Sequence, residues 1–315
     1  MTEPHPIRTS LIVPAYNYER FVARTLESAL AQDDPGVEII VVDDGSTDGT
    51  AEVVRPFVDR GVRYFRKPNG GLPAARNTGI GEARGKYLVF LDADDLLEPH
   101  AVRTFREAME SRPPEFGIVA CGYRTIDTED RPIEDKSQGA DGRLSEVKLS
   151  DMIVRTRFCT TVMARTEAIR AAGLFDESLR ASEDRDMWIR VAAAGYRIAL
   201  LPEVLVLVRR HGSNMSADPV RQMTAVRQVL RKAWRNRLAP RWNLLLWGRA
   251  WAIYHHQGSS MYWDRRQRWP AWRHLLLSFL CWPIFLKPAW NGQRMFFRLR
   301  RVLAWAMRFG REWKT

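Results

Sequence analysis

The sequence predicts an α/β fold in which helices flank a mainly parallel sheet. Between residues 10 and 91, short apolar runs alternate with segments of helical periodicity. The runs are nearly continuous and rich in β-branched residues, as expected for strands buried on both faces. Two of the runs end in aspartates. Ligands of such sheets bind at the carboxyl ends of the strands, so these acids mark the expected binding edge.

The elements follow from the apolar spacing. The runs SLIVP, VEIIVV and KYLVFL are typical of buried strands, whereas YERFVARTLESALAQ places apolar residues at helical spacing. The expected strands are residues 10–14, 37–42, 62–65, 86–91 and 203–209. The expected helices are residues 18–32, 50–59, 73–83, 149–155 and 183–194. The segment 112–150 is rich in Pro, Gly and charge and predicts loops with short strands.

The composition divides the chain into two regions. Residues 221–315 contain 20 Lys and Arg, two acids and 11 of the 12 tryptophans. Their net charge is +18, which leaves −6 of the total +12 for the first 220 residues. Strand patterns stop after about residue 217, and helical segments follow that are broken near Pro240, Pro270, Pro283 and Pro288. The sequence therefore predicts an α/β domain over residues 1–216 and a basic, Trp-rich helical region over residues 217–315.

Several classes of protein are disfavoured. The three cysteines lie far apart without a CxxC pair, which argues against a zinc or disulfide framework and favours a reducing compartment. The N-terminus lacks the apolar core of a secretion signal. The apolar stretch 275–286 is about half the length of a bilayer span and contains Pro283. We therefore expect a cytoplasmic protein without a spanning helix.

The segment LDADD at residues 91–95 is the strongest single signal of chemistry. Asp92 and Asp94, at the end of an expected strand, can hold a hard divalent cation whose remaining ligands are waters and phosphate oxygens. An isolated pair of this kind is more often a solvated turn. The pair gains weight only from the motifs around it.

Three further segments carry candidate functional groups. Arg76 follows a glycine turn at an expected helix start, where it could bind an anion or form a surface salt bridge. Glu183 and Asp184 begin a helical segment, where a carboxylate is a general base or only a helix cap. His211 follows a strand and could bind a metal or a diphosphate, although a lone histidine is more often structural.

Taken together, the motifs resemble those of a family 2 glycosyltransferase with the GT-A fold. They are SLIVPAYN, VVDDGSTDGT, GGLPAARNTGI, LDADD, the SED cluster at 182–184 and RRH at 209–211. The resemblance covers residues 8 to about 216. It implies a Rossmann-like nucleotide-diphospho-sugar transferase fold and a nucleotide-sugar donor.

The resemblance also implies roles for the residues of the nucleotide site. Asp44, with Asp43 as its neighbour, matches the strand-end aspartate that hydrogen-bonds the base of the donor. Pro14 and Tyr16 match the loop that lines the base pocket, and Tyr16 could stack on the ring. Arg76 matches an arginine that contacts the nucleotide. A UDP-sugar is the default donor, with dTDP and GDP sugars open.

The remaining roles concern the metal and the reaction. Asp92 and Asp94 match the pair that binds Mn²⁺ or Mg²⁺, and Asp94 is the expected direct ligand. His211 falls where some members place a residue near the metal and diphosphate. Asp184 matches the catalytic base. The mechanism implied is a single inverting displacement at the anomeric carbon of the donor.

The sequence departs from part of the family 2 glycosyltransferase pattern, and other classes of protein can be weighed against this resemblance. The sequence has no QxxRW motif, since RQRW at 266–269 has a different spacing, so transfer of one sugar per encounter is expected. A sugar-1-phosphate nucleotidyltransferase should have an early glycine-rich loop, and PAYNYER is not one. GIGEARG is not a dinucleotide fingerprint. An inactive nucleotide- or carbohydrate-binding module remains, although the acids at 92, 94 and 184 argue against it.

The basic, Trp-rich region has three interpretations. Interleaved arginines and tryptophans favour in-plane binding to an anionic membrane, and helical packing is the main alternative. Nothing resembles a nucleic-acid-binding motif, so no nucleic-acid partner is expected. We expect a saccharide or lipid-linked saccharide acceptor, a role in bacterial surface polysaccharide or glycolipid assembly, and a peripheral place at the inner face of the cytoplasmic membrane.

Overall fold

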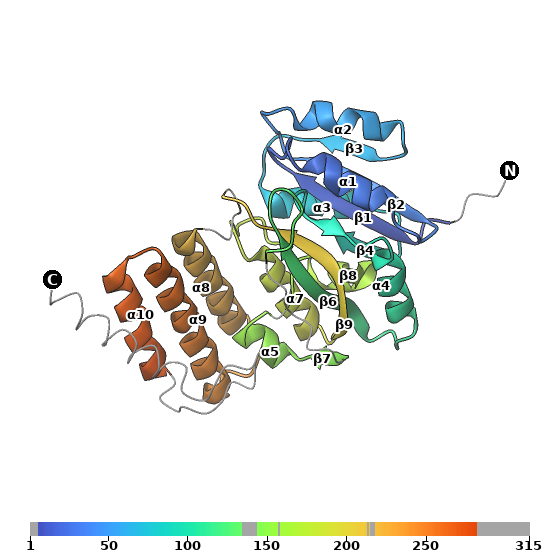
Figure 1. Ribbon diagram of the computed structural model, residues 1–315. Coiled ribbons are helices and arrows are strands. Elements are labelled where there is room, and N and C mark those ends of the chain that lie inside the picture. The colour runs from blue at the N-terminus through green and yellow to red at the C-terminus, as the bar shows by residue number, and fades with distance from the viewer. Residues whose placement is uncertain (1–5, 134–143, 157, 213, 215–217, 282–315) are drawn as a thin grey trace. The chain divides into compact units, whose positions relative to one another are not determined.

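The structure is a computed structural model that describes residues 6–133, 144–156, 158–212, 214 and 218–281 (Figure 1). The chain divides into two compact units, Met1–Ala239 and Pro240–Thr315. This division lies beyond the expected boundary at 216/217, because helix α8, Pro219–Arg235, belongs to the first unit. The ammonium of its Lys232 lies 2.9 Å from the carboxylate of Asp186.

Nine strands form one mixed sheet within the described residues. They are β1 Thr9–Ala15, β2 Val37–Asp43, β3 Arg63–Arg66, β4 Tyr87–Phe90, β5 Leu96–Leu97, β6 Phe116–Ile126, β7 Ser145–Val147, β8 Met163–Arg165 and β9 Arg197–Arg209. The order is β3-β2-β1-β4-β8-β6-β9-β5, and β7 pairs with β9. Six strands (β3, β2, β1, β4, β6 and β9) run in one direction, against β5, β7 and β8. The carboxyl ends of these six therefore share one edge.

Helices lie on both sides of this sheet (Figure 1). Besides α8, the helices of the first unit are α1 Val22–Leu30, α2 Thr50–Val58, α3 Leu72–Glu82, α4 Ala101–Glu110, α5 Leu149–Val154, α6 Thr166–Ala172 and α7 Glu183–Ala193. Successive strand residues point to opposite faces. In β2, Val41 packs in a core with α1, α2 and α4, whereas Ile40 and Val42 pack with Ala75 of α3. Burial of both faces explains why the apolar runs are continuous.

Strands β9 and β6 differ clearly from the sequence-based expectation. Strand β9 begins at Arg197, six residues earlier than expected. The expected strand began only after Pro202, which lies where the β6–β9 register shifts. Proline is tolerated at such bulges. Strand β6, Phe116–Ile126, occupies a segment expected to hold only short strands. Its Gly117 lies so close to Tyr196 that an added Cβ would stand 2.8 Å from that side chain. Gly117 contributed to the expectation of a loop, but in the structure it allows β6 to pack closely against Tyr196.

The second unit contains the long helices α9, Leu244–Asp264, and α10, Arg268–Cys281, as the helical expectation requires. Pro270 does not break α10. It lies in the first turn, where the missing N–H costs no intrahelical hydrogen bond. The expected breaks at Pro283 and Pro288, like all of residues 282–315, lie outside the described residues.

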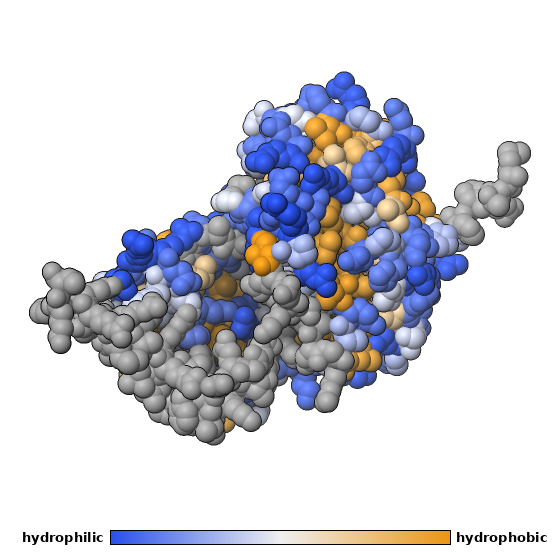
Figure 2. Space-filling model, viewed as in Figure 1, coloured by the Kyte–Doolittle hydropathy of each residue, from blue (hydrophilic) through white to orange (hydrophobic). Residues whose placement is uncertain are grey.

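None of the described helices combines the length and the apolar character that crossing a bilayer requires. On the face in Figure 2, hydrophilic residues cover much of the first unit, with apolar residues exposed between them. The chemistry expected from the sequence lies within this first unit.

Candidate active site

The shared edge of the sheet brings most of the predicted site residues together. Tyr16 follows β1, Asp44 follows β2, Asp92 and Asp94 follow β4, and His211 follows β9. All four strands run in the same direction, so their carboxyl ends meet at one side. The segments that carry these side chains are turns, which explains why the apolar runs stop there.

Asp43 is the last residue of β2 and is fully buried. One carboxylate oxygen accepts a hydrogen bond from the amide of Ser46 at 2.7 Å, and the other accepts from the Tyr64 hydroxyl at 2.6 Å. Burial, and then this hydrogen bond, raise the pKa of Tyr64 above its ordinary value. Asp43 therefore closes the turn after β2 and ties it to β3.

Asp44 anchors the loop that leads into α3. Its Oδ1 accepts from the Lys67 ammonium at 2.6 Å and from the Gly70 amide at 2.9 Å, and its Oδ2 accepts from the Gly71 amide at 2.7 Å. The next residue, Gly45, has φ of 77°, a conformation that favours glycine. A nucleobase donor can reach Asp44 in place of Lys67, whose side chain is 24% exposed.

The two residues expected to line the base pocket differ in exposure. Pro14 is buried within β1, opposite Val42 of β2. Tyr16 is 45% exposed just beyond the strand, so its ring is open to stacking. Tyr16 therefore offers the larger contact surface.

Arg76 occupies a different environment from the one expected for a nucleotide contact. Its side chain is 1% exposed and packs over the Phe175 ring. One guanidinium nitrogen donates to Glu183 at 2.5 Å, and another donates to Asp92 at 2.7 Å. Burial opposes the charge of Arg76, but the carboxylates of Asp92 and Glu183 outweigh it and raise its pKa. In this structure Arg76 joins the first turn of α7 to the end of β4.

The acids after β4 have separate partners. Asp94 Oδ2 lies 2.8 Å from His211 Nε2 and accepts from the Asn214 amide at 3.1 Å. Asp95 accepts from the backbone amide of Arg209 at 2.9 Å, which ties this turn to β9. Burial, and then the charges of Asp94 and Asp92, raise the pKa of Asp95. Burial also raises the pKa of Asp92, against the opposing charge of Arg76.

The fit to a divalent cation is partial. In the part of the chain that the structure describes, no three His, Cys, Asp or Glu side chains are placed to hold a metal ion together. Asp94 and His211 form an adjacent pair of potential ligands, whereas Asp92 has one oxygen committed to Arg76. Mg²⁺ sites commonly use one or two carboxylates with water and substrate phosphates. The donor set suits an ion that is completed by a diphosphate.

Asp184 lies in the first turn of α7 and is partly exposed. Its Oδ2 accepts from the Thr160 hydroxyl at 3.1 Å, and its Oδ1 accepts from the amide of Arg185 at 2.7 Å. Its neighbours are committed elsewhere, since Glu183 pairs with Arg76 and Asp186 pairs with Arg190 and Lys232. Asp184 is thus the acid of this turn that remains suited to proton transfer.

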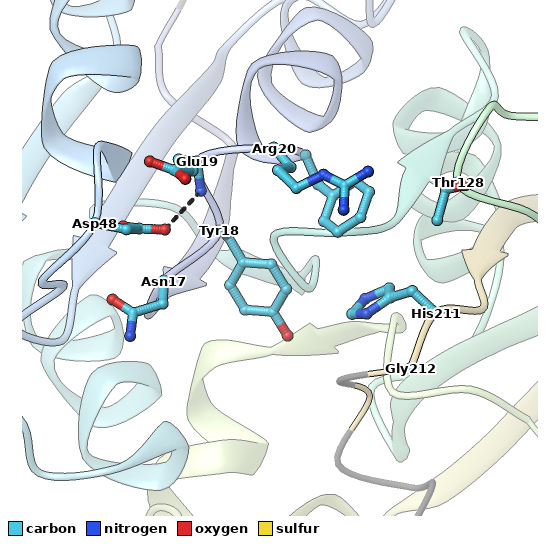
Figure 3. A pocket seen from close by; sticks show the side chains of 9 residues that line it. Asn17, Tyr18, Glu19, Arg20, Asp48, Thr128, His211 and Gly212 are labelled. Carbon is cyan, nitrogen blue, oxygen red and sulfur yellow. Dashed lines mark hydrogen bonds between the residues drawn. The ribbon is translucent and has the colours of Figure 1, made fainter.

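A cavity of about 410 Å³ opens beside His211 (Figure 3). It is lined by Asn17, Tyr18, Glu19, Arg20, Phe21, Asp48, Thr128, His211 and Gly212. Phe21 stacks on the His211 ring at 4.8 Å between centroids. Burial, and then the charges of Asp94 and Asp92, raise the pKa of Tyr18. The polar lining, which contains Glu19 and Asp48 as well as Arg20, suits a hydrogen-bonding ligand.

Sequence reasoning missed several residues of this site. Tyr18, Phe21 and Asn214 contact or line the His211 region, and Thr160 holds Asp184. Tyr18 and Phe21 belong to a segment that reads as the start of a helix by apolar spacing. Helix α1 instead begins at Val22, after a turn in which Asn17 has φ of 60°. No pattern in the sequence marks Thr160.

Comparison with known proteins supports the resemblance of this chain to glycosyltransferases. The model of the family described as glycosyl transferase family 2 matches residues 10–171. The uncharacterized glycosyltransferase EpsJ of Bacillus subtilis (strain 168) is 30% identical over 239 residues, which cover 73% of this chain and 68% of EpsJ. Chondroitin synthase of Pasteurella multocida (strain Pm70) is 32% identical over 218 residues, which cover 66% of this chain and 21% of that protein.

A solved structure extends the comparison to the fold. The mannosyltransferase PcManGT of Pyrobaculum calidifontis, in complex with GDP-Man and Mn²⁺, superposes with a TM-score of 0.63 at 21% identity. The match covers 96% of this chain and 81% of that chain. The expected GT-A fold is confirmed, with its flanking helices and a helical C-terminal region. The chain belongs to glycosyl transferase family 2 and is a glycosyltransferase.

Proposed function

We propose that this glycosyltransferase moves one sugar from a nucleotide-diphosphate sugar to an acceptor hydroxyl, with inversion at the anomeric carbon. The buried bridge of Arg76 is the observation that supports it best. The bridge connects Glu183, the neighbour of Asp184, to Asp92, which is two residues from Asp94. A candidate base and a candidate diphosphate site are thereby held at one edge of the sheet.

The donor is proposed to lie along this edge. The base would stack on Tyr16 and hydrogen-bond Asp44, in exchange for the Lys67 contact. The diphosphate would extend toward Asp94 and His211, beside the cavity that Arg20 lines. A UDP-sugar remains the default, and the GDP-Man bound to PcManGT keeps GDP among the alternatives with dTDP.

A divalent cation, Mn²⁺ or Mg²⁺, is proposed as the cofactor. Asp94 and His211 would hold it, with the second oxygen of Asp92 as a further ligand. When bound, such an ion supplies positive charge to a diphosphate leaving group. PcManGT was solved with Mn²⁺, which supports this choice of ion by analogy.

The proposed chemistry is a single displacement. Asp184 takes the proton of the acceptor hydroxyl, whose oxygen attacks the anomeric carbon from the side opposite the diphosphate. The bond between that carbon and the diphosphate oxygen breaks as the new glycosidic bond forms. Thr160 and the Arg185 amide keep the Asp184 carboxylate oriented during the transfer.

The acceptor is proposed to be a saccharide or a lipid-linked saccharide in bacterial surface polysaccharide or glycolipid assembly. The similarity to chondroitin synthase supports a saccharide product. The proposed place is the cytoplasmic side of the membrane, at its surface. All proposed site residues lie between residues 14 and 211, within the proposed catalytic domain of residues 1–216.

The test is calorimetric titration of UDP, GDP and dTDP into the protein, with Mn²⁺ or with EDTA. One nucleotide should bind only when metal is present. The Asp94→Ala variant should lose this metal-dependent binding, and the Asp44→Ala variant should bind the nucleotide more weakly. Arg103→Ala, at an exposed ion pair on α4, is the control and should bind as the wild type does. Absence of metal-dependent binding of all three nucleotides would favour an inactive module.

A further inference from the structure

Helix α10 carries two opposite stripes of residues. Ala271, Leu275 and Ser278 are fully buried, whereas Trp269, Leu276 and Leu280 are 79%, 60% and 77% exposed. The exposed residues recur at intervals of seven and four and therefore share one face of the helix. Arg273 lies on the same face and is also exposed. The outer face of α10 is thus apolar along most of its length.

This outer face is not needed to hold α10 on α9. The inner face packs Ala271 and Leu275 against aromatic side chains of the two helices, among them Tyr262 and Trp263. The rings of His255 and His274 add a contact between the helices, with their Nδ1 atoms 3.1 Å apart. The helix pair therefore has its own core, and the outer stripe is an additional surface.

Among the described residues, large exposed apolar side chains cluster in the second unit. In the first unit, large exposed apolar residues occur singly, on separate elements, as is normal for a globular protein. In the second unit, Trp242, Leu244 and Leu245 at the start of α9 are also 65% exposed or more. Only residues 265–267 join α9 to α10, so the start of α9 lies at the same end as Leu280.

The charge of this unit decides which occupant suits the stripe. Residues 240–281 contain six arginines and a single acid, Asp264, and α10 itself has no acid. A second copy would bring the same positive charge to the contact. The sequence 282–315 is also basic, with eight Lys and Arg against Glu312. Anionic lipid phosphates, by contrast, complement the arginines while the apolar stripe enters the acyl boundary.

We propose that the outer face of α10 is a membrane-docking surface for anionic lipid. Trp269, Leu276 and Leu280 enter the interfacial region, and Arg273 and the neighbouring arginines bind lipid phosphates at its surface. This role rests on the proposed function only in its purpose, which is to hold the enzyme where a lipid-linked acceptor resides. The docking surface itself requires no catalysis.

The experiment is flotation of the full chain with vesicles in the absence of nucleotide. One set of vesicles contains phosphatidylcholine alone, and the other also contains phosphatidylglycerol. We expect binding to the anionic vesicles that weakens as salt is added, and little binding to phosphatidylcholine alone. Leu276→Glu combined with Leu280→Glu should weaken binding roughly tenfold or more, because two inserted side chains become charged.

The control combines Val58→Glu with Val220→Glu, which removes two exposed apolar side chains of the first unit with the same change in charge. It should bind vesicles as the wild type does. Far-UV circular dichroism and nucleotide titration establish that both variants are folded. Equal loss in both variants, equal binding to neutral vesicles, or no binding to anionic vesicles would overturn the proposal. So would a wild-type dimer, seen by light scattering, that the α10 variant dissociates. None of these outcomes depends on donor binding or on glycosyl transfer, and nucleotide titration tests the donor site separately.

Discussion

Replacing Arg76 by methionine removes the positive charge between Glu183 and Asp92 while keeping an apolar stem over Phe175. The side chains of Arg76 and Glu183 are 1% and 5% exposed, so Glu183 would be left buried without its counter-charge. Breaking a buried ion pair in this way costs about 3–5 kcal/mol of unfolding free energy. Asp92, whose side chain is 28% exposed, retains some hydration and should add less.

The assay is urea unfolding followed by far-UV circular dichroism, at neutral pH and at about pH 5. Burial already raises the pKa of Glu183 above its ordinary value, against the opposing charge of Arg76. Without Arg76 that pKa rises further, so the variant is most destabilised at neutral pH. Its deficit should shrink as Glu183 takes up a proton on acidification.

The matched control is Arg103→Met, which breaks a pair with Asp33 in which both side chains are 44% exposed. Water screens this pair, so the variant should lose little stability and show no such recovery. Equal losses of unfolding free energy in the two variants at neutral pH would refute the role of the buried bridge. So would a deficit of Arg76→Met that does not shrink on acidification.

Three further predictions concern single residues. Thr160→Val should lower kcat roughly fivefold to tenfold with KM little changed, since it removes one orienting hydrogen bond of about 1 kcal/mol. Thr161→Val is the control, because its buried hydroxyl has no hydrogen-bond partner in the described residues, and equal losses would contradict the role. Gly45→Ala should cost about 1–3 kcal/mol in urea unfolding and weaken nucleotide binding, since its Cβ would stand 2.8 Å from a backbone nitrogen. Gly61→Ala, at φ of 93° with open space, should unfold more like the wild type and bind nucleotide normally. Burial, and then a neighbouring histidine, lower the pKa of His255 to about 4. As the pH drops below about 6.5, the unfolded chain takes up a proton at this histidine before the folded chain does, so thermal stability should fall. His255→Asn should flatten that decline, and an unchanged slope of Tm against pH would refute the assignment.

The parallel part of the sheet could be predicted because its strands are buried on both faces. Such burial leaves continuous apolar runs that end where the chain reaches the ligand edge, as at Asp44 and Asp92. Strand β9 was underestimated because Pro202 interrupts its run, and only the partner strand reveals that the interruption is a bulge. Local sequence cannot show a register shift between strands far apart in the chain.

The motifs of the site could be recognised from the sequence, but the ion-pair partners of their side chains depend on the tertiary structure. The sequence marked Arg76 as an anion-binding group and could not show that its anions are carboxylates of the protein, one of them 107 residues away. Thr160 lies in an irregular segment, where no periodicity constrains its side chain. The expected roles of Asp44 and Asp94 stay predictions that nucleotide titration tests, and the role of Asp184 stays a prediction about the transfer step.

The bridge at Arg76 has a consequence for building chimaeras between related transferases. It spans α3, the turn after β4 and the first turn of α7, which are distant in the sequence. Where a related transferase carries other residues at these positions, a graft of only the donor loops would leave a charge without its complement. Recombination of donor specificity should therefore treat these three segments as one module and exchange them together.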